Sequence, residues 1–302
     1  MNLFPDIASI EYHFTITEAN TILLMALQSH CPDSISLSNQ QFKQLCEMGA
    51  VWVAEPHPKT AKIARPGRIR RAKKALAIHS EVSVYINPQV LNRIAPTPIL
   101  IADEGDYSVW YKPKGMLSQG SKWGDHTTLY RWIERNRPFE LHPQRPCWPV
   151  HRLDKATDGL MLIAHTKKRA HQLARQFELR HLQKHYRAWV AGHFCDTFSG
   201  LPHHFQTPVH CKKAHTEVQA CHYDSEQNRS LLTIKLHSGR KHQIRIHLAE
   251  AGFAIIGDRL YGQAGEDDID LQLTAVKLTL LQDTEQPLKT YQLPESLMFG
   301  QT

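Results

Sequence analysis

Residues 150–164 read VHRLDKATDGLMLIA, a polar turn that runs directly into an apolar run. Residues 160–164 are all apolar and have the length of a buried strand. Asp154 precedes this strand, so it should lie at the rim of a core, where a carboxylate is held rigidly and still meets a substrate. Taken alone, an Asp close to Gly159 is more often a residue that closes a turn. The rest of the chain has to decide between these two interpretations.

The composition indicates a folded protein. The 302 residues suit one large domain or two smaller ones, and 41% hydrophobic residues are enough for a core. No apolar run approaches the roughly 18 residues of a membrane helix. Residues 1–10 lack the basic start and apolar centre of a signal peptide. We therefore expect a cytoplasmic protein with no membrane association.

The charge distribution favours RNA as a partner. The formal net charge is +7, which favours a polyanion only weakly by itself. Two basic runs, 56–80 and 166–187, flank the segment of Asp154 and have aromatic residues nearby, as phosphate-binding surfaces do. Their cations are Lys59, Lys62, Arg65, Arg68, Arg70, Arg71, Lys73 and Lys74 in the first run, and Lys167, Lys168, Arg169, Arg175, Arg180, Lys184 and Arg187 in the second. The alternative is a solvated basic face.

The cysteines predict neither a metal site nor a disulfide framework. None of the six forms a Cys-x-x-Cys pair, so we expect reduced, inert thiols. Histidines and cysteines do cluster between His193 and His222, but their spacings match no standard zinc pattern. We therefore expect no metal.

The first 95 residues read as a small basic module. A helix is predicted over 38–48, with Ser38 as its N-cap, and strands over 50–53 and 77–86. The segments GAVWV (49–53) and EVSVY (81–85) make residues 38–90 loosely similar to an S4 RNA-binding domain. A generic linker subdomain is the alternative. The proline-rich segment 88–98 suggests a boundary, which gives an N-terminal module at 1–95 and a second domain at 96–302.

The second domain alternates strands and helices. We expect strands at 99–102, 107–111, 160–164, 184–192, 230–237 and 271–280. Thr166 should cap an amphipathic helix, and another helix should begin near Lys241 and end at Gly252. Strand, helix and strand then return Tyr186 to the sheet that holds Asp154.

Four segments in this order resemble the RluA-type pseudouridine synthases. They are KPKG (112–115), HRLD (151–154) with Thr157 and Gly159, KHY (184–186), and GRKHQIRIHL (239–248) followed by Gly257-Asp258 and Tyr261-Gly262. The resemblance covers residues 99–280. It implies an α+β fold in which helices and loops flank a mixed, largely antiparallel sheet. It also implies an isomerase that converts uridine to pseudouridine in RNA without a metal or organic cofactor.

The resemblance also implies roles for single residues. Asp154 is the catalytic carboxylate, Tyr186 stacks on the target base and is a candidate for helping proton removal, and Arg245 is the basic partner of Asp154. Arg152 helps to hold the place of the flipped-out nucleotide. The full set expected at the substrate is Arg152, His151, Lys112, Arg240, His242 and Gln243.

The chemistry agrees with these residue types. The reaction detaches uracil from C1′, turns it and rejoins it through C5, so nothing is oxidised and no group is imported. A carboxylate either attacks C1′ or takes a proton from C2′, and both routes stay open. His151, His242 and His247 are expected to be structural or to contact RNA, because no nucleophile pattern accompanies them.

One position departs from the family. Residue 158 is Asp, where the family commonly has a small hydroxyl residue. We expect Asp158 to cap the turn. The alternatives are that it repels Asp154, raises its pKa or contacts the substrate.

Two other functions compete with the isomerase. One is a catalytically silent RNA-binding or ribosome-assembly factor, and a more distant one is a hydrolytic N-glycosidase. The presence of Asp154, Tyr186 and Arg245 together argues against the silent factor. Ribosomal RNA is favoured over transfer RNA as the substrate because of the N-terminal basic module, and a monomer is expected.

Overall fold

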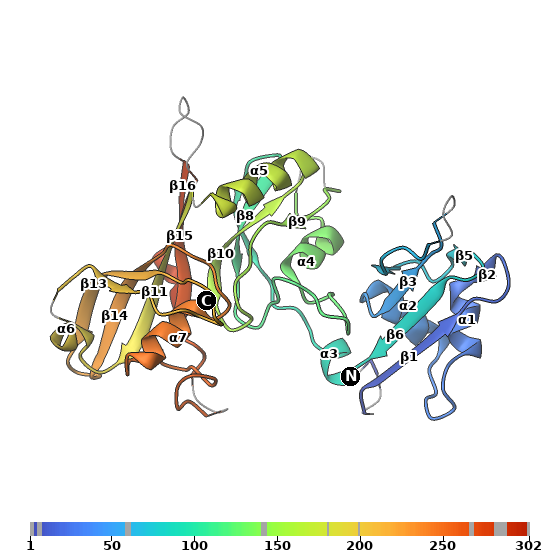
Figure 1. Cartoon of the computed structure of the whole chain (residues 1–302), viewed down its shortest axis with the longest axis horizontal. Helices are drawn as coiled ribbons and strands as arrows, with labels where there is room; N and C mark the ends of the chain where they lie inside the picture. The colour runs from blue at the N-terminus through green and yellow to red at the C-terminus, as the bar shows by residue number, and fades with distance from the viewer. Residues whose placement is uncertain are drawn as a thin grey trace. The chain divides into compact units, whose positions relative to one another are not determined.

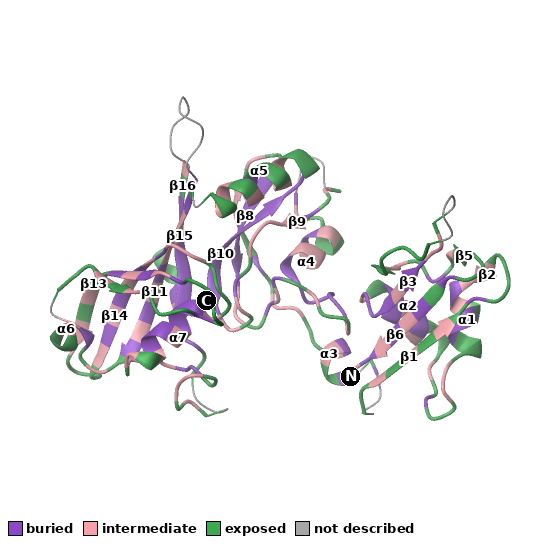
Figure 2. Ribbon diagram, viewed as in Figure 1, coloured by how far each residue is buried: buried purple, intermediate pink, exposed green. Residues whose placement is uncertain are grey.

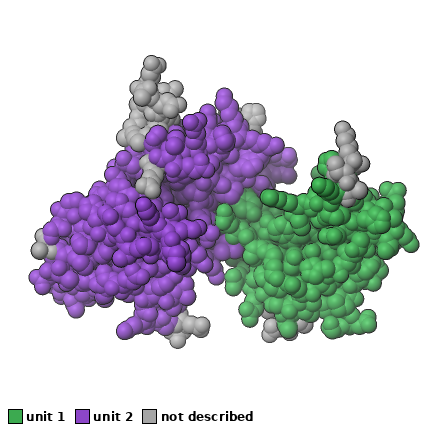
Figure 3. Space-filling model, in the orientation of Figure 1, with its two compact units in different colours: residues 1–95, 119–132 green, residues 96–118, 133–302 purple. Residues whose placement is uncertain are grey.

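The computed structural model describes residues 3–4, 8–57, 62–139, 144–179, 181–198, 200–265, 269–280 and 289–300. Lys59 and Arg180 of the two basic runs lie outside these residues. The chain divides into two compact units, 1–95 with 119–132, and 96–118 with 133–302 (Figure 3). The segment 119–132, which we had placed in the second domain, groups with the first unit by its contacts.

The first unit is a four-stranded antiparallel sheet with helices. The strand order is β1 (Ile10–Thr15), β6 (Glu81–Ile86), β3 (Val51–Ala54) and β4 (Gly67–Arg68), and β2 (Thr21–Ile22) pairs separately with β5 (Ala75–Leu76). Its helices are α1 (Leu23–Ser29), α2 (Asn39–Glu47) and α3 (Pro88–Leu91). The predicted helix is confirmed in α2, where Ser38 and Gln41 form a capping box and Phe42, Leu45 and Cys46 enter the core.

Part of the first basic run serves the fold. Arg70 pairs with the buried Asp125 at 2.5 Å, and the guanidinium of Arg68 lies 4.2 Å from the ring centre of Trp52. Lys74 pairs with Glu55 at 2.6 Å. The predicted phosphate-binding face is therefore smaller than the sequence suggested. The cations of this run that are exposed are Lys62, Arg65, Arg71 and Lys73.

The second unit is built on one large sheet (Figure 1). Its main path is β12 (His203–Phe205), β13 (Thr216–Asp224), β14 (Arg229–Leu236), β11 (Leu182–Ala191), β15 (Leu273–Leu280), β10 (Asp158–Ala164), β8 (Tyr107–Lys112) and β7 (Ile99–Asp103). The strand β9 (Trp148–Pro149) pairs with β10, and β16 (Lys289–Gln292) pairs with β15. Within the described residues, β10 and β15 are the parallel pair and the other pairs are antiparallel, which confirms the mixed, largely antiparallel sheet.

Helices cover the sheet on either side of a buried central strand. The helices are α5 (Lys167–Glu178), α6 (Phe194–Thr197) and α7 (Gln243–Glu250), with α4 (Leu129–Asn136) crossing the division between the units and a 3₁₀ segment at Glu295–Gly300. Every residue of β10 is buried (Figure 2). Gly159 makes its pairing with β15 possible, because a Cβ there would lie 2.3 Å from the carbonyl oxygen of Ala275. Thr166 caps α5 as predicted.

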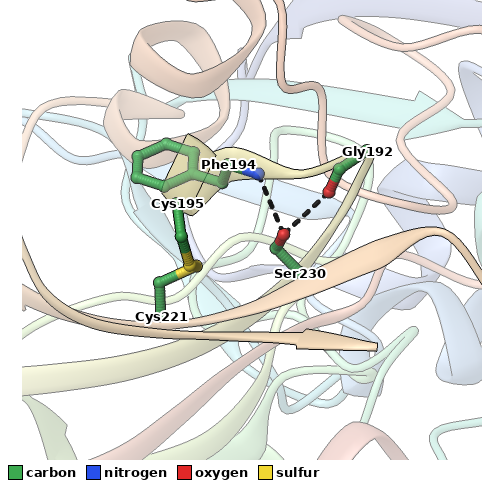
Figure 4. Close-up of a disulfide and its surroundings, with 5 residues drawn as sticks. All are labelled: Gly192, Phe194, Cys195, Cys221 and Ser230. Atoms are coloured by element: carbon green, nitrogen blue, oxygen red, sulfur yellow. Dashed lines mark hydrogen bonds between the residues drawn. A yellow bond between two sulfur atoms is a disulfide. The ribbon is translucent and has the colours of Figure 1, made fainter. Parts of the chain in front are cut away.

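A disulfide joins Cys195 of α6 to Cys221 of β13 (Figure 4). Our expectation of reduced thiols was wrong for these two residues, since cysteines 26 residues apart carry no sequence signal of their meeting in space. Beside them, the Ser230 hydroxyl donates to the Gly192 carbonyl at 2.7 Å and accepts from the Phe194 amide at 3.0 Å. The remaining cysteines form no disulfide: Cys31, Cys46, Cys147 and Cys211.

The described part of the chain contains neither a metal-binding cluster nor a membrane-spanning helix. No three or more His, Cys, Asp or Glu side chains there are grouped so that they could hold a metal ion. Among the same residues, no helix has both the length and the apolar character needed to span a bilayer.

Reducing the disulfide should destabilise the second unit. A cross-link over 26 residues lowers the entropy of the unfolded chain, which is worth about 3 kcal/mol. We expect dithiothreitol to lower the urea midpoint of the oxidised protein. The Cys195→Ser/Cys221→Ser double variant should match the reduced protein and not respond to dithiothreitol. Equal midpoints for the oxidised protein and the double variant would contradict this.

Candidate active site

The loop of Asp154 is held on both sides by the segment that follows β8. The Ser118 hydroxyl donates to the carbonyl of Leu153 at 2.7 Å and accepts from its amide at 3.0 Å. On the other side of Asp154, the amide of Gly115 donates to the carbonyl of Lys155 at 2.9 Å. Because the backbone is anchored immediately before and after residue 154, its carboxylate has a defined position.

Lys112 supports this arrangement from inside the protein. Its side chain is fully buried, and its ammonium donates to the carbonyls of Pro113 and Met116 at 3.1 and 3.0 Å. Burial lowers the pKa of Lys112 to about 7, although the negative charges of Asp158 and Asp154 act in the opposite direction. Lys112 therefore closes the turn that holds Asp154 and does not reach the surface. This corrects our expectation that it contacts the substrate.

Asp154 lies at the boundary of two cavities. One of about 250 Å³ is also lined by Tyr186, Arg152 and Arg240. The other, of about 430 Å³, is lined by residues that include Arg245 and His242. The carboxylate is thus open to two neighbouring spaces, with the aromatic residue of the predicted site on one side and the guanidinium on the other.

Tyr186 enters its cavity beside an irregularity in the sheet. The register between β11 and β15 shifts between His185 and Tyr186, because β15 carries one extra residue, Val276, there. Burial raises the pKa of Tyr186, and the charge of Asp154 raises it further. The phenol is therefore protonated at neutral pH, where it presents an aromatic face and a hydrogen-bond donor. It is not a phenolate that could remove a proton.

Arg245 has a different direct partner from the one we predicted. Its guanidinium donates twice to the carboxylate of Asp258, at 2.7 and 2.6 Å, and both side chains are buried. Burial opposes the charge of Arg245, but the hydrogen bonds to Asp258 outweigh it, and the more remote charge of Asp154 adds to them, so the pKa is raised. Arg245 therefore interacts with Asp154 electrostatically, whereas its hydrogen bonds go to Asp258. Asp258 belongs to the segments that resemble the family, but we predicted no role for it from the sequence.

His242 lies between Asp154 and Tyr261. Its Nε2 lies 3.7 Å from Oδ1 of Asp154, and its Nδ1 lies 2.9 Å from the Tyr261 hydroxyl. Burial lowers its pKa although Asp154 acts to raise it, so a neutral ring faces the carboxylate. The residue has a φ of 58°, in the left-handed region that non-glycine residues seldom adopt. Backbone of this kind persists where the surrounding structure enforces it, often at functional sites.

Two further residues predicted at the substrate have structural contacts instead. Nε2 of His151 accepts a hydrogen bond from the Leu162 amide at 2.9 Å, and its Nδ1 is buried. The buried amide of Gln243 bonds to Ser238, to the Arg240 amide and to Thr216. Neither residue lines the two cavities at Asp154. Of the six residues predicted at the substrate, those at the cavities are Arg152, Arg240 and His242.

Asp158 does not cap the turn as we expected. It is the first residue of β10, is fully buried, and accepts hydrogen bonds from Thr274 at 2.6 Å and Tyr111 at 3.2 Å. Burial raises its pKa, although Thr274, Lys114, Tyr111 and Lys112 act to lower it. Asp158 therefore ties β10 to its two neighbouring strands and lines neither cavity at Asp154.

Removing Asp258 should destabilise the protein strongly. Asp258→Ala leaves the buried Arg245 guanidinium without its partner, which costs about 3–5 kcal/mol. Asp270→Ala is the matched control, because it breaks a pair with Arg259 at an Asp270 side chain that is 61% exposed. Exposed pairs contribute about 1 kcal/mol or less. Urea unfolding measures both variants, and equal losses would contradict the assignment.

His151 should make stability depend on pH. Burial lowers its pKa to about 3 in the folded protein, whereas an unfolded histidine titrates near about 6.5. Between these values the unfolded chain binds more protons, so stability falls as the pH drops from 6.5 towards 3. His151→Asn should reduce this fall in the free energy of unfolding, whereas the same change at the exposed His210 should not. Identical pH profiles for all three proteins would refute it.

Comparisons with known proteins identify the family. A family model described as RNA pseudouridylate synthase matches residues 106–250. The dual-specificity RNA pseudouridine synthase RluA of Escherichia coli (strain K12) is 31% identical over 179 residues, which cover 55% of this chain and 78% of that protein. The ribosomal large subunit pseudouridine synthase D of Borreliella burgdorferi is 32% identical over 199 residues, 60% of each chain.

A solved structure extends the likeness to the fold. Human RNA pseudouridylate synthase domain containing 1 superposes with a TM-score of 0.52 at 21% identity and covers 69% of this chain and 89% of that chain. At this sequence identity the match supports a shared fold and nothing further. The sequence relatives show that the chain belongs to the RluA-type RNA pseudouridine synthases, enzymes that isomerise uridine in RNA.

Proposed function

We propose that Asp154 is the catalytic carboxylate and that the target uridine occupies the 250 Å³ cavity between Asp154 and Tyr186. The observation that carries this proposal is the position of Asp154. It is the one carboxylate among the residues lining that cavity, and its backbone is anchored on both sides. A base that leaves its stack needs a pocket with an aromatic face, which Tyr186 supplies.

The neighbouring residues have distinct tasks in this proposal. The protonated Tyr186 stacks on the uracil and keeps the detached base in place. The two hydrogen bonds from Arg245 to Asp258 fix the Arg245 guanidinium at the cavity that Asp154 also lines. Arg152 and Arg240 line the cavity and bind the phosphates around the flipped nucleotide.

The isomerisation balances without a cofactor. The bond between N1 of uracil and C1′ breaks, the base turns, and a bond between C5 and C1′ forms. C5 then loses its proton, and N1 gains one. Asp154 serves either as the nucleophile at C1′ or as the base at C2′, and its exposure to both cavities is compatible with each route.

For the substrate we propose ribosomal RNA, with transfer RNA second. The exposed cations of the first basic run support a contact with a large structured RNA. Arg68 and Arg70 do not add to this support, since they have partners inside the first unit. That unit is proposed to bind RNA in the manner of an S4-like domain.

Replacing Asp154 should abolish turnover and leave RNA binding intact. We expect Asp154→Asn to form pseudouridine at least about 1,000-fold more slowly than the wild type in ribosomal or transfer RNA from cells lacking the protein. The control Asp196→Asn, at an exposed position on α6, should retain wild-type activity.

Three outcomes would count against parts of the proposal. Full activity of Asp154→Asn would remove the assigned carboxylate. Wild-type protein that binds RNA without turnover on either RNA class would favour a silent RNA-binding factor, and release of free uracil would indicate an N-glycosidase. Mapping pseudouridines in cells with and without the protein decides between ribosomal and transfer RNA.

A further inference from the structure

A third cavity adjoins the one that holds Asp154 and Tyr186. Its volume is about 330 Å³, within the roughly 300–1,000 Å³ typical of ligand pockets. It shares a wall with the Asp154–Tyr186 cavity, formed by Lys184, Leu236, Gly239 and Arg240. The two cavities are therefore direct neighbours, so two adjacent nucleotides of one RNA strand could occupy them.

Lys184 is the central cation of the shared wall. It lies two residues before Tyr186 on β11, so the two side chains leave the same face of the strand. Its ammonium lies 5.6 Å from the ring centre of Phe177 and, among the described residues, has no hydrogen bond or ion pair. Burial lowers its pKa to about 8. Because this ammonium borders two cavities and has no partner among the described residues, its three donors are available to a ligand.

The neighbours of Lys184 favour an anion. Lys235 and Arg240 also line the cavity, against the single carboxylate of Glu178. One nitrogen of Arg240, Nε, donates to the Lys213 carbonyl at 3.0 Å. Gly239 leaves room at the wall, because a Cβ there would lie 3.2 Å from Nζ of Lys184. The positive charge is thus concentrated where the two cavities meet.

We propose that this third cavity binds the nucleotide next to the target uridine, with the phosphodiester between the two nucleotides held by Lys184 and Arg240. The proposal rests on the assignment of the target uridine to the cavity of Asp154 and Tyr186. An RNA-modifying enzyme meets a phosphodiester on each side of its target nucleotide, and the shared wall is the place where such an anion passes from one space to the next. The ring of Phe177 provides an apolar contact for the neighbouring base or ribose.

The test replaces the charged Lys184 by an uncharged side chain of similar length. Lys184→Met loses one cation at the shared wall, and Lys277→Met loses one on β15 without lining any of the cavities around Asp154. Both variants are made in the Asp154→Asn background, and their affinity for total ribosomal RNA and total transfer RNA is measured at several salt concentrations. Each phosphate contact contributes about 0.7–0.9 to the slope of log affinity against log salt.

We expect Lys184→Met to weaken binding several-fold at low salt and to lower the slope by about one contact. In the active enzyme it should raise KM and leave kcat within about twofold. Lys277→Met should keep the slope and KM. Arg240→Gln, at the same shared wall, should act in the same direction as Lys184→Met and serves if Lys184→Met does not fold.

An unchanged slope and KM in Lys184→Met would overturn the subsite. This outcome differs from failure of the proposed function, in which wild-type protein forms no pseudouridine in either RNA. The salt slopes are measured without turnover, so they test the subsite in both cases. A merely structural role for Lys184 would shift the urea midpoint and leave the salt slope unchanged.

Discussion

The Ser118 hydroxyl, which bonds to both the amide and the carbonyl of Leu153, is the contact on which the site depends. Together with the bond from Gly115 to Lys155, it holds the residue between them in one conformation. Lys112 in turn closes the turn from which Gly115 and Ser118 follow. A catalytic carboxylate needs this rigidity, because small displacements of a reacting group cost much of its effect.

The charged side chains around Asp154 fall into two classes. Arg245 and Asp258 satisfy each other with two short hydrogen bonds, so the pair is a part of the fold that holds the guanidinium in place. Lys184 lines two cavities and has no such partner among the described residues. The first class is part of the fold, and the second leaves a cation available to the RNA at the proposed subsite.

The sheet explains how distant segments meet at one place. β10 follows the loop of Asp154, β11 carries Tyr186, and β15 lies between them. The close approach of Gly159 to Ala275 and the register shift beside Tyr186 both occur where β15 meets these two strands. Local irregularities of the central strands therefore lie beside the residues that define the site. Asp158 joins this region through Thr274, which explains how a carboxylate replaces a hydroxyl residue there.

Patterns that act over a few residues were readable from the sequence. The caps at Ser38 and Thr166, the apolar strand after Asp154 and the order of the four family segments depend on neighbours along the chain, and the sequence alone determined them. Contacts between remote residues were decided only by the tertiary structure. The Cys195–Cys221 disulfide, the pairing of Arg245 with Asp258 and the burial of Lys112 depend on which strands become adjacent. A motif specifies which side chains are present, but packing decides which of them face a cavity and which become part of the core.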